Sequence, residues 1–297
     1  MWIILWIIQS FIASLWMIMS KKALENKEVW NNLQTFFSRT NHTIVVFLLY
    51  LFSIFIFNVD FFDININNSD ITTFNIFIFV ASTFALYTTY PLRRIAYANE
   101  KVSTLQPFAM LFQVFPVIFW FIFIASERAN LVTFLMAILA SLIVIWFSID
   151  FKKFKINKYS LMVLTSSTIK SVQIFAIIYM LTFLTPSSLY LIESIFIIFI
   201  SLFLMFINKE FWEFKLITKK YFNLLWIATT LGIISIILSL TMYKTLWVVT
   251  TSLLSLLYLV FIYFFWSLIL WEKASKKDVL ITIFVSICIV VWMLFKA

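Results

Sequence analysis

The sequence contains little charge, and its few charged residues lie mainly between long apolar runs. Of its 297 residues, 12% are charged, 64% are hydrophobic and 20% are aromatic. A soluble domain carries about 25% charged residues and about 45–50% apolar residues. No water-soluble fold can bury so much apolar surface, so the bilayer must be the solvent for most of this chain. Composition alone therefore predicts an integral membrane protein.

Glycine, cysteine and histidine each occur once. With only Gly232, close helix contacts must depend on Ala, Ser and Thr rather than on GxxxG faces. The lone cysteine, Cys288, excludes an intrachain disulfide, and the lone histidine, His42, excludes a multi-histidine metal site or a conventional Ser-His-Asp triad. The sequence also has no P-loop, HEXXH, CxxC or acidic metal cluster. We therefore expect no enzyme activity, no catalytic residues, no metal and no cofactor.

Ten apolar runs follow one another along the chain, and most have the length of about 17–25 residues that crosses a bilayer as a helix. The first run is expected to be a retained helix, because Lys21 and Lys22 follow it rather than precede it. We predict an all-α integral membrane protein with ten transmembrane helices, nine or eleven being the alternatives. The runs lie at residues 2–19, 43–58, 74–91, 104–125, 131–149, 160–184, 188–207, 222–243, 246–270 and 279–296.

Basic residues gather in every second loop. The loops after the odd-numbered helices carry 18 basic residues, Arg39, Arg93 and Arg94 among them, whereas the other loops carry only Arg128 and Lys244. Under the positive-inside rule, the odd-numbered loops are cytoplasmic and both termini lie outside a cell membrane. Because the charges sit in short loops, we assign the net charge of +9 to contact with anionic lipid rather than with nucleic acid.

Two of the predicted loops combine aromatic and basic residues. Residues 24–38 place Trp30, Leu33 and Phe37 at helical spacing, and residues 209–222 mix aromatic side chains with lysines. Both patterns are typical of helices that lie on the inner leaflet. A hydrated loop with aromatic anchors explains them equally well.

The two halves of the chain are related by a shift of 145 residues. This shift aligns Ala125–Arg128 with Leu270–Lys273, and it superposes the third, fourth and fifth predicted helices on the eighth, ninth and tenth. Each half, 1–149 and 150–297, then holds five helices. An odd number makes the second half enter the membrane from the opposite face, so we predict an inverted repeat, which is typical of transporters.

With these features, the sequence resembles the ten-helix, EamA-like branch of the drug/metabolite transporter superfamily. The resemblance rests on the five-plus-five arrangement and on a short hairpin of the third and fourth helices followed by a Ser/Thr-led helix. It also rests on an acidic-basic pair that closes that helix, Glu127-Arg128 in the first half and Glu272-Lys273 in the second.

The resemblance covers nearly the whole chain and is strongest at residues 80–148 and 228–294. The family is glycine-rich and has glycine before the acidic residue of the pair, where this chain has Ser126 and Trp271. The resemblance implies export or exchange of small metabolites by alternating access through a cavity between the halves. The superfamily also includes flippases of lipid-linked sugars and carriers of nucleotide sugars or amino acids, so the resemblance does not fix a substrate.

Lys170 lies near the middle of the predicted helix 160–184. A charge at that depth costs at least about 2.5–3.5 kcal/mol, so it must face a wet cavity or a partner. Gln173 and Ser166 extend a polar stripe on the same face. We expect Lys170 to bind a substrate carboxylate or phosphate. The alternative is a structural lysine that bonds to carbonyls or to Glu193, although the two residues differ in expected depth by about a dozen Å.

Polar stripes on other predicted helices extend the candidate binding site. The matched fourth and ninth helices each carry a stripe, Gln9 lies in the middle of the first helix as a candidate counterpart of Lys170, and Tyr87 lies on the third. The alternatives are hydrogen bonding between helices for the stripes and a lipid-facing aromatic belt for Tyr87. The stripe residues are Gln106 and Gln113 on the fourth helix, and Thr251, Ser255 and Tyr258 on the ninth.

Together, these patterns predict a secondary transporter of a small anionic or zwitterionic metabolite, of the amino acid or organic acid class. It would work in the lipid bilayer as a monomer or homodimer, by alternating access. A flippase for a lipid-linked intermediate, or a non-catalytic membrane assembly subunit, is the alternative.

Overall fold

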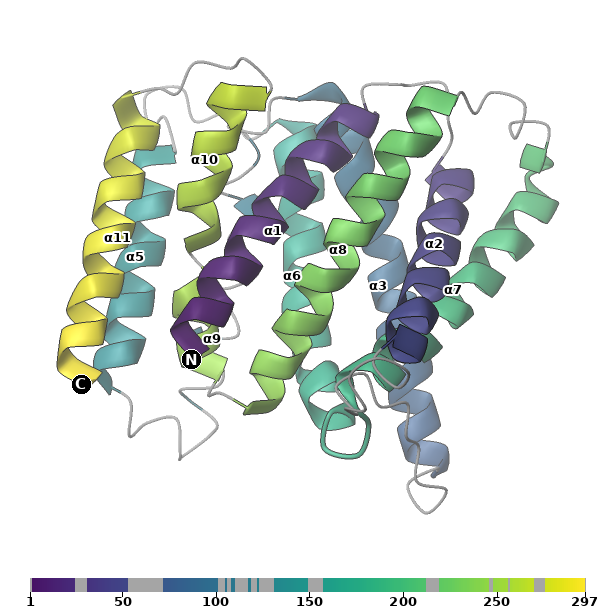
Figure 1. Cartoon of the computed structure of the whole chain (residues 1–297), viewed down its shortest axis with the longest axis horizontal. Coiled ribbons are helices and arrows are strands. Elements are labelled where there is room, and N and C mark those ends of the chain that lie inside the picture. The colour runs from purple at the N-terminus through teal and green to yellow at the C-terminus, as the bar shows by residue number, and fades with distance from the viewer. Residues whose placement is uncertain are drawn as a thin grey trace.

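The structure is a computed structural model, and in the part of the chain that it describes every regular element is a helix (Figure 1). It describes residues 2–24, 31–52, 72–100, 105, 108–109, 117–118, 122, 131–148, 157–211, 219–245, 248–255, 257–269 and 276–296. The helices are α1 (Trp2–Leu24), α2 (Asn31–Phe52), α3 (Thr73–Asn99), α5 (Leu131–Ser148), α6 (Lys158–Met180), α7 (Pro186–Ile207), α8 (Lys219–Thr245), α9 (Val248–Ser255), α10 (Leu257–Ile269) and α11 (Lys276–Lys296).

Side-chain caps determine where several helices begin. Thr72 accepts a hydrogen bond from the backbone N–H of Asn75 at the start of α3, and Asn157 accepts one from Ser160 at the start of α6. Thr185 caps α7 in the same way, and Pro186 follows at the first helical turn. Each cap satisfies a backbone donor that the first turn leaves without a helical partner.

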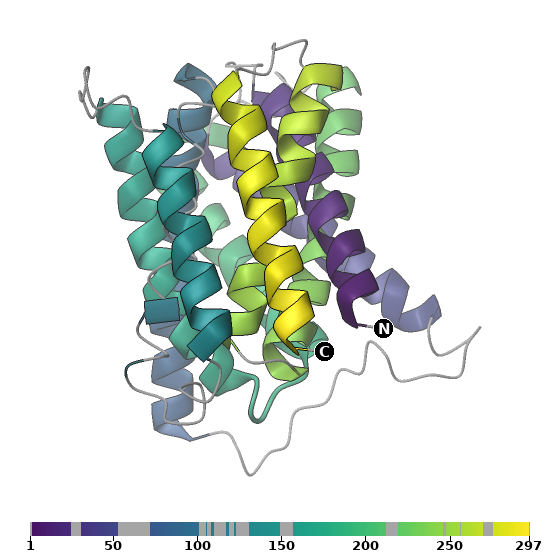
Figure 2. The ribbon, with the colours of Figure 1, turned by 90° about the vertical axis from the view of Figure 1, so that its left-hand side faces the viewer.

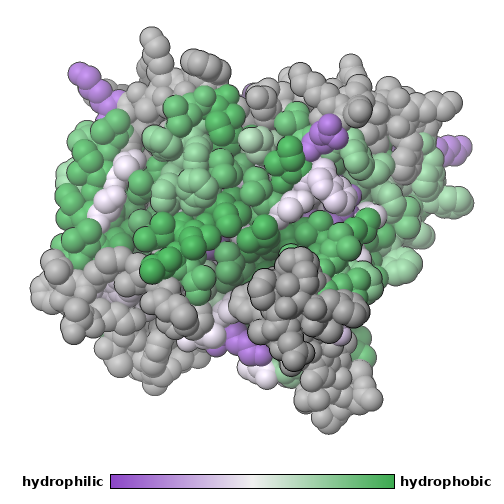
Figure 3. Space-filling model, in the orientation of Figure 1, coloured by the Kyte–Doolittle hydropathy of each residue, from purple (hydrophilic) through white to green (hydrophobic). Residues whose placement is uncertain are grey.

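The helices present apolar side chains outward, and the space-filling view shows them over much of the visible face (Figure 3). On α7, for example, Phe199, Phe203 and Phe206 are each at least 64% exposed. In the described part, Thr73–Asn99, Lys158–Met180, Pro186–Ile207 and Phe222–Thr245 are long and apolar enough to cross a membrane. The chain is thus all-helical in its described part, as predicted, and it is compatible with a multi-pass membrane protein.

The helices pack in long pairs. α3 lies along α6, α1 along α8, α2 along α7, and α5 along α11. Figure 1 shows the α2–α7 and α5–α11 pairs at the two ends of the long axis, and Figure 2 looks onto the α5–α11 end. Trp2 and Lys296, the outer residues of the first and last helices, lie at the same end of the bundle (Figures 1 and 2).

The structure corrects two helix boundaries. α2 begins at Asn31 instead of residue 43, and α3 ends at Asn99 instead of residue 91. The proposal of an interfacial helix or hydrated loop is therefore wrong for residues 31–38, where Leu33 is fully buried. Apolar runs underestimate these helices because polar side chains on their ends turn toward the protein interior.

The other expected segments agree with the structure or lie outside its described part. α9 and α10 cover most of the run predicted at 246–270. Most of 104–125 lies outside the described residues, and so do 212–218 and the pairs Glu127-Arg128 and Glu272-Lys273 that carry the family resemblance.

Candidate functional site

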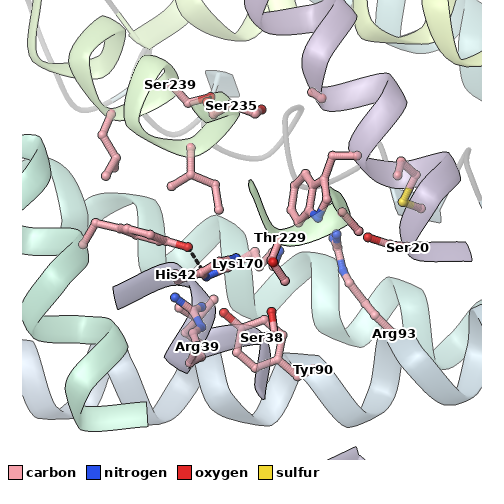
Figure 4. Close-up of a pocket in the computed structure, with 18 of the residues that line it drawn as sticks. Ser20, Ser38, Arg39, His42, Tyr90, Arg93, Lys170, Thr229, Ser235 and Ser239 are labelled. Atoms are coloured by element: carbon pink, nitrogen blue, oxygen red, sulfur yellow. Dashed lines mark hydrogen bonds between the residues drawn. The ribbon is translucent and has the colours of Figure 1, made fainter. Parts of the chain in front are cut away.

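A cavity of about 390 Å³ lies among α1, α2, α3, α6, α7 and α8, with one wall residue from α10. Its size falls within the range of about 300–1,000 Å³ that is usual for small-ligand sites. Figure 4 shows side chains from several of these helices directed into it. The charged residues of the lining are Arg39, Arg93, Arg94, Lys170 and Glu193, and the uncharged polar ones include Gln9, Ser20, Gln34, Thr35, Ser38, His42, Gln173, Thr229, Ser235 and Ser239.

Lys170 lines this cavity from the middle of α6, beside His42 and Thr229 (Figure 4). Its side chain makes no hydrogen bond or ion pair with any residue that the structure describes. Two structural alternatives were raised for this lysine, a bond to backbone carbonyls and a pair with Glu193. Neither contact is found among the described residues. In that part of the chain, this half-buried side chain faces the cavity without a direct contact partner.

Glu193 of α7 lies across the cavity wall from α6. Its Oε1 accepts a hydrogen bond of 3.2 Å from Nε2 of Gln173, one helical turn from Lys170. The positive charges of Arg39 and Lys170 act on this carboxylate without contacting it directly. Gln173 thus holds the acidic group in place, and the lysine remains separate from it.

Arg39 of α2 is 4% exposed and firmly positioned. Its Nη1 donates a hydrogen bond of 3.2 Å to Oγ of Ser194, and its guanidinium carbon lies 5.0 Å from the ring centroid of Tyr90 and 5.4 Å from that of Tyr190. Arginine over an aromatic face is stabilised by the charge distribution of the ring. The hydroxyl of Tyr190 in turn hydrogen-bonds to Nδ1 of His42. This bond holds the Tyr190 ring that packs against one side of Arg39.

Two arginines reach the cavity from the C-terminal part of α3. Arg93 donates from Nε to Ser166 at 2.9 Å and from Nη2 to Ser167 at 3.3 Å, and both serines are fully buried on α6. Arg94 donates from Nη1 to Thr35 of α2 at 2.6 Å. These contacts connect α3 to α6 through Arg93 and to α2 through Arg94, and both arginines line the cavity.

The structure places four of the predicted site residues in the cavity lining. Lys170, Gln173, Gln9 and Tyr258 all line the cavity, and Gln9 donates from Nε2 to Ser235 and Ser239 of α8.

Two further predicted residues, Tyr87 and Thr251, lie outside the cavity lining. Tyr87 is buried away from the cavity wall, with its hydroxyl bonded to Asn32, and Thr251 is fully buried. Gln106 and Gln113 lie outside the described residues, as does the side chain of Ser255.

Sequence reasoning missed Arg39, Arg93 and Arg94, which it assigned to cytoplasmic loops. A signal was present for the segment that contains Arg39. Polar residues recur at four-residue intervals at Gln34, Ser38 and His42, which places them on one face of a helix.

No family model and no curated protein matches the chain. No group of three or more His, Cys, Asp or Glu side chains is placed to hold a metal ion within the described ranges. A solved crystal structure of a protein matches 95% of this chain and 94% of its own chain, with a TM-score of 0.61 and 15% sequence identity. At that identity, the match shows that the two chains share a fold.

Proposed function

We propose that this protein is a secondary transporter of a small anionic or zwitterionic metabolite, and that the cavity carries the substrate between the two sides of a membrane. The observation that supports this most strongly is the lining itself. Arg39, Arg93, Arg94 and Lys170 face one small cavity inside a bundle whose exterior is apolar. Charges inside a membrane are costly, and such residues usually serve a substrate or ion pathway.

Alternating access through an inverted repeat is supported by helix lengths. α1 and α6 each contain 23 residues, α2 and α7 each contain 22, and α3 and α8 each contain 27. These are the pairs that match if the first five helices correspond to the last five. The starts of α5 and α11, at Leu131 and Lys276, are separated by the 145 residues found in the sequence.

The packing of the helices supports the same symmetry. Exchanging each helix for its counterpart turns the α1–α8 pair into the α6–α3 pair and leaves α2–α7 and α5–α11 unchanged. Arg39 and Ser194 are each the ninth residue of their helices, which begin at Asn31 and Pro186, and these two side chains bond to each other. Contacts between equivalent residues are expected beside a twofold axis. By the same count, the α1 counterpart of Lys170 is Ser14 rather than Gln9.

This arrangement agrees with the proposed membership of the EamA-like branch of the drug/metabolite transporter superfamily. The proposal includes ten transmembrane helices, cytoplasmic odd-numbered loops and both termini outside. Arg39, Arg93 and Arg94 lie in helices and face the cavity, so the charge bias that supports this orientation now rests on the remaining basic residues of those loops.

Solute exchange in proteoliposomes tests the proposal. Vesicles that contain the purified protein would be preloaded with one unlabelled solute, and uptake of the labelled solute would then be measured. The panel covers organic acids, amino acids, sugar phosphates, neutral sugars and organic cations. We expect exchange of at least one anion or zwitterion by the wild type, little or none by Lys170→Met, and normal exchange by Lys158→Met, which removes an exposed lysine at the start of the same helix.

Other outcomes would contradict the proposal. Exchange that remains unchanged in Lys170→Met would exclude Lys170 as a substrate anchor. If no solute in the panel exchanges and labelled lipid-linked sugar moves between leaflets instead, the protein is a flippase. If neither moves, a non-catalytic assembly role becomes the better account.

A further inference from the structure

We infer that the preferred ligand of this cavity is a small dianion without an ammonium group, held between Lys170 of α6 and Arg39 of α2. The inference rests on the proposed function and narrows its substrate class, because it separates multiply charged anions from monoanions and from zwitterions such as amino acids. The shared ligand chemistry is two negative charges, supplied either by two carboxylates or by one phosphate ester.

The charge balance of the lining favours a ligand with two negative charges. Four cationic side chains line the cavity against the single carboxylate of Glu193 among the described lining residues. Lys170 and Arg39 each lack an acidic contact partner in the described part, since Arg39 bonds to Ser194 and stacks between tyrosines. Like charges that face one small volume repel each other in a medium of low dielectric constant. A ligand with two negative charges relieves that repulsion more fully than one with a single charge.

The position of Glu193 disfavours a ligand with an ammonium group. A zwitterion needs an acceptor for its ammonium group, and Glu193 is the only carboxylate of the lining that the structure describes. Its Oε1 already accepts from Gln173, and the charges of Lys170 and Arg39 act on the same carboxylate. An ammonium group beside Glu193 would be repelled by the positive charges of Lys170 and Arg39, so binding of a zwitterion there is disfavoured.

The positions equivalent to these cations in the other half of the chain are uncharged. Counting from the helix starts, the counterparts of Lys170 and Arg39 are Ser14 and Ser194, and Arg93 corresponds to Ser239. The repeat therefore does not impose these cations, because serine occupies the equivalent place in the other half. Each of these pairs carries a cation at one member and serine at the other, and the cations are available to serve a charged ligand.

The two cations differ in a way that suits one dianion. Arg39 is held rigidly and presents a planar fork of N–H donors, whereas Lys170 carries a compact charge on a flexible stem. Figure 4 shows both side chains directed into the same space, with Ser38 and Thr229 nearby. Arg39 can fix the first anionic oxygens, and Lys170 can move to the second group or to another phosphate oxygen.

A matched series of ligands tests the inference by isothermal titration of the purified full chain at pH 7.5. Succinate has two carboxylates, butyrate has the same carbon chain with one, and aspartate is succinate with an added ammonium group. Glycerol phosphate supplies both charges from one phosphate. We expect succinate or glycerol phosphate to bind at least about tenfold more tightly than butyrate and aspartate. Which of the two binds more tightly tells the dicarboxylate source from the phosphate source.

Variants connect that preference to the two cations. Lys170→Met should reduce binding of the preferred dianion by about tenfold or more, Lys170→Arg should retain most of it, and Lys158→Met should leave it unchanged. Arg39→Gln should also weaken binding, and Lys170→Met keeps the inference testable if that buried variant does not fold.

The outcomes distinguish a failure of the dianion inference from a failure of the proposed transport function. Butyrate or aspartate binding as tightly as both dianions would overturn the dianion inference and leave a transport function intact. Failure of all four ligands to bind would overturn it too. Tight, Lys170-dependent binding of a dianion without exchange in proteoliposomes would support the site and contradict transport.

Discussion

The indole of Trp16 on α1 lies against Gly232 on α8. A Cβ atom at position 232 would lie 2.9 Å from Nε1 and 3.0 Å from Cε2 of Trp16. Gly232 is the only glycine in the sequence, and Trp16 also lines the cavity. The single glycine is therefore found where a large side chain of α1, which also borders the candidate site, packs against α8.

Replacing that glycine should disturb both packing and the cavity wall. Gly232→Ala forces Trp16 to move, and such overpacking costs about 1–3 kcal/mol, partly offset by the gain of about 1 kcal/mol in helix propensity. We expect a small net destabilisation, measured as a lower midpoint of thermal unfolding in detergent, together with a change in tryptophan fluorescence.

Trp16→Phe provides the matched background for this experiment. The smaller ring leaves room for a methyl group, so Gly232→Ala should cost less stability there than in the wild type. An equal cost in both backgrounds would mean that the contact with Trp16 is not what requires glycine at this position.

Lys170 should contribute to binding and not to stability. Its ammonium group has no hydrogen-bond or ion-pair partner in the described part of the chain, and a central membrane charge costs about 2.5–3.5 kcal/mol. We therefore expect Lys170→Met to unfold at a temperature equal to or above that of the wild type. A marked loss of thermal stability would instead identify Lys170 as a structural residue, and the matched Lys158→Met variant reports the effect of losing an exposed lysine.

The hydrogen bonds between Arg93 and α6 should adjust ligand affinity without changing charge. Ser166 and Ser167 accept from Nε and Nη2 of Arg93, and a hydrogen bond to a charged group is worth about 1.5–3 kcal/mol, part of which is lost as ligand affinity. The double substitution of Ser166 and Ser167 by alanine should weaken anion binding by roughly three- to thirtyfold, read by titration calorimetry.

Ser141→Ala is the control for that double variant. Ser141 is buried on α5, and its hydroxyl donates to the carbonyl of Ala137 in its own helix, away from the cavity. It should leave anion affinity unchanged. Equal affinity in the double variant and in the control would show that Arg93 does not need its serines for binding.

The sequence was sufficient to predict the helical class and part of the site. Apolar runs located most helices, since bilayer thickness fixes the length of a spanning segment. Lys170 and Gln173, which the sequence singled out, line the cavity, because a charge within an apolar run must turn inward.

The rest of the site depended on packing that sequence patterns do not reveal. Arg39, Arg93 and Arg94 flank apolar runs, where a loop charge and a cavity charge look alike. Only the pairing of α2 with α7 and of α3 with α6 turns these arginines inward. Tyr87 and Tyr90 are three residues apart on one helix, yet Tyr90 lines the cavity and the Tyr87 hydroxyl bonds to Asn32 outside it.

Access to the cavity from each side of the membrane in turn is the property that most directly defines a transporter of this kind. α1 and α8 run antiparallel, because Gln9 contacts Ser239 while Trp16 lies against Gly232. Ser20 and Ser239 therefore mark opposite ends of the cavity. In a Cys288→Ala background, Ser20→Cys and Ser239→Cys can each be labelled with a thiol reagent that does not cross the membrane.

We predict that the two positions label from opposite sides, and that a bound solute speeds labelling of one while it slows labelling of the other. Labelling of both positions from the same side only, unchanged by any bound solute, would contradict alternating access and describe a one-sided pocket.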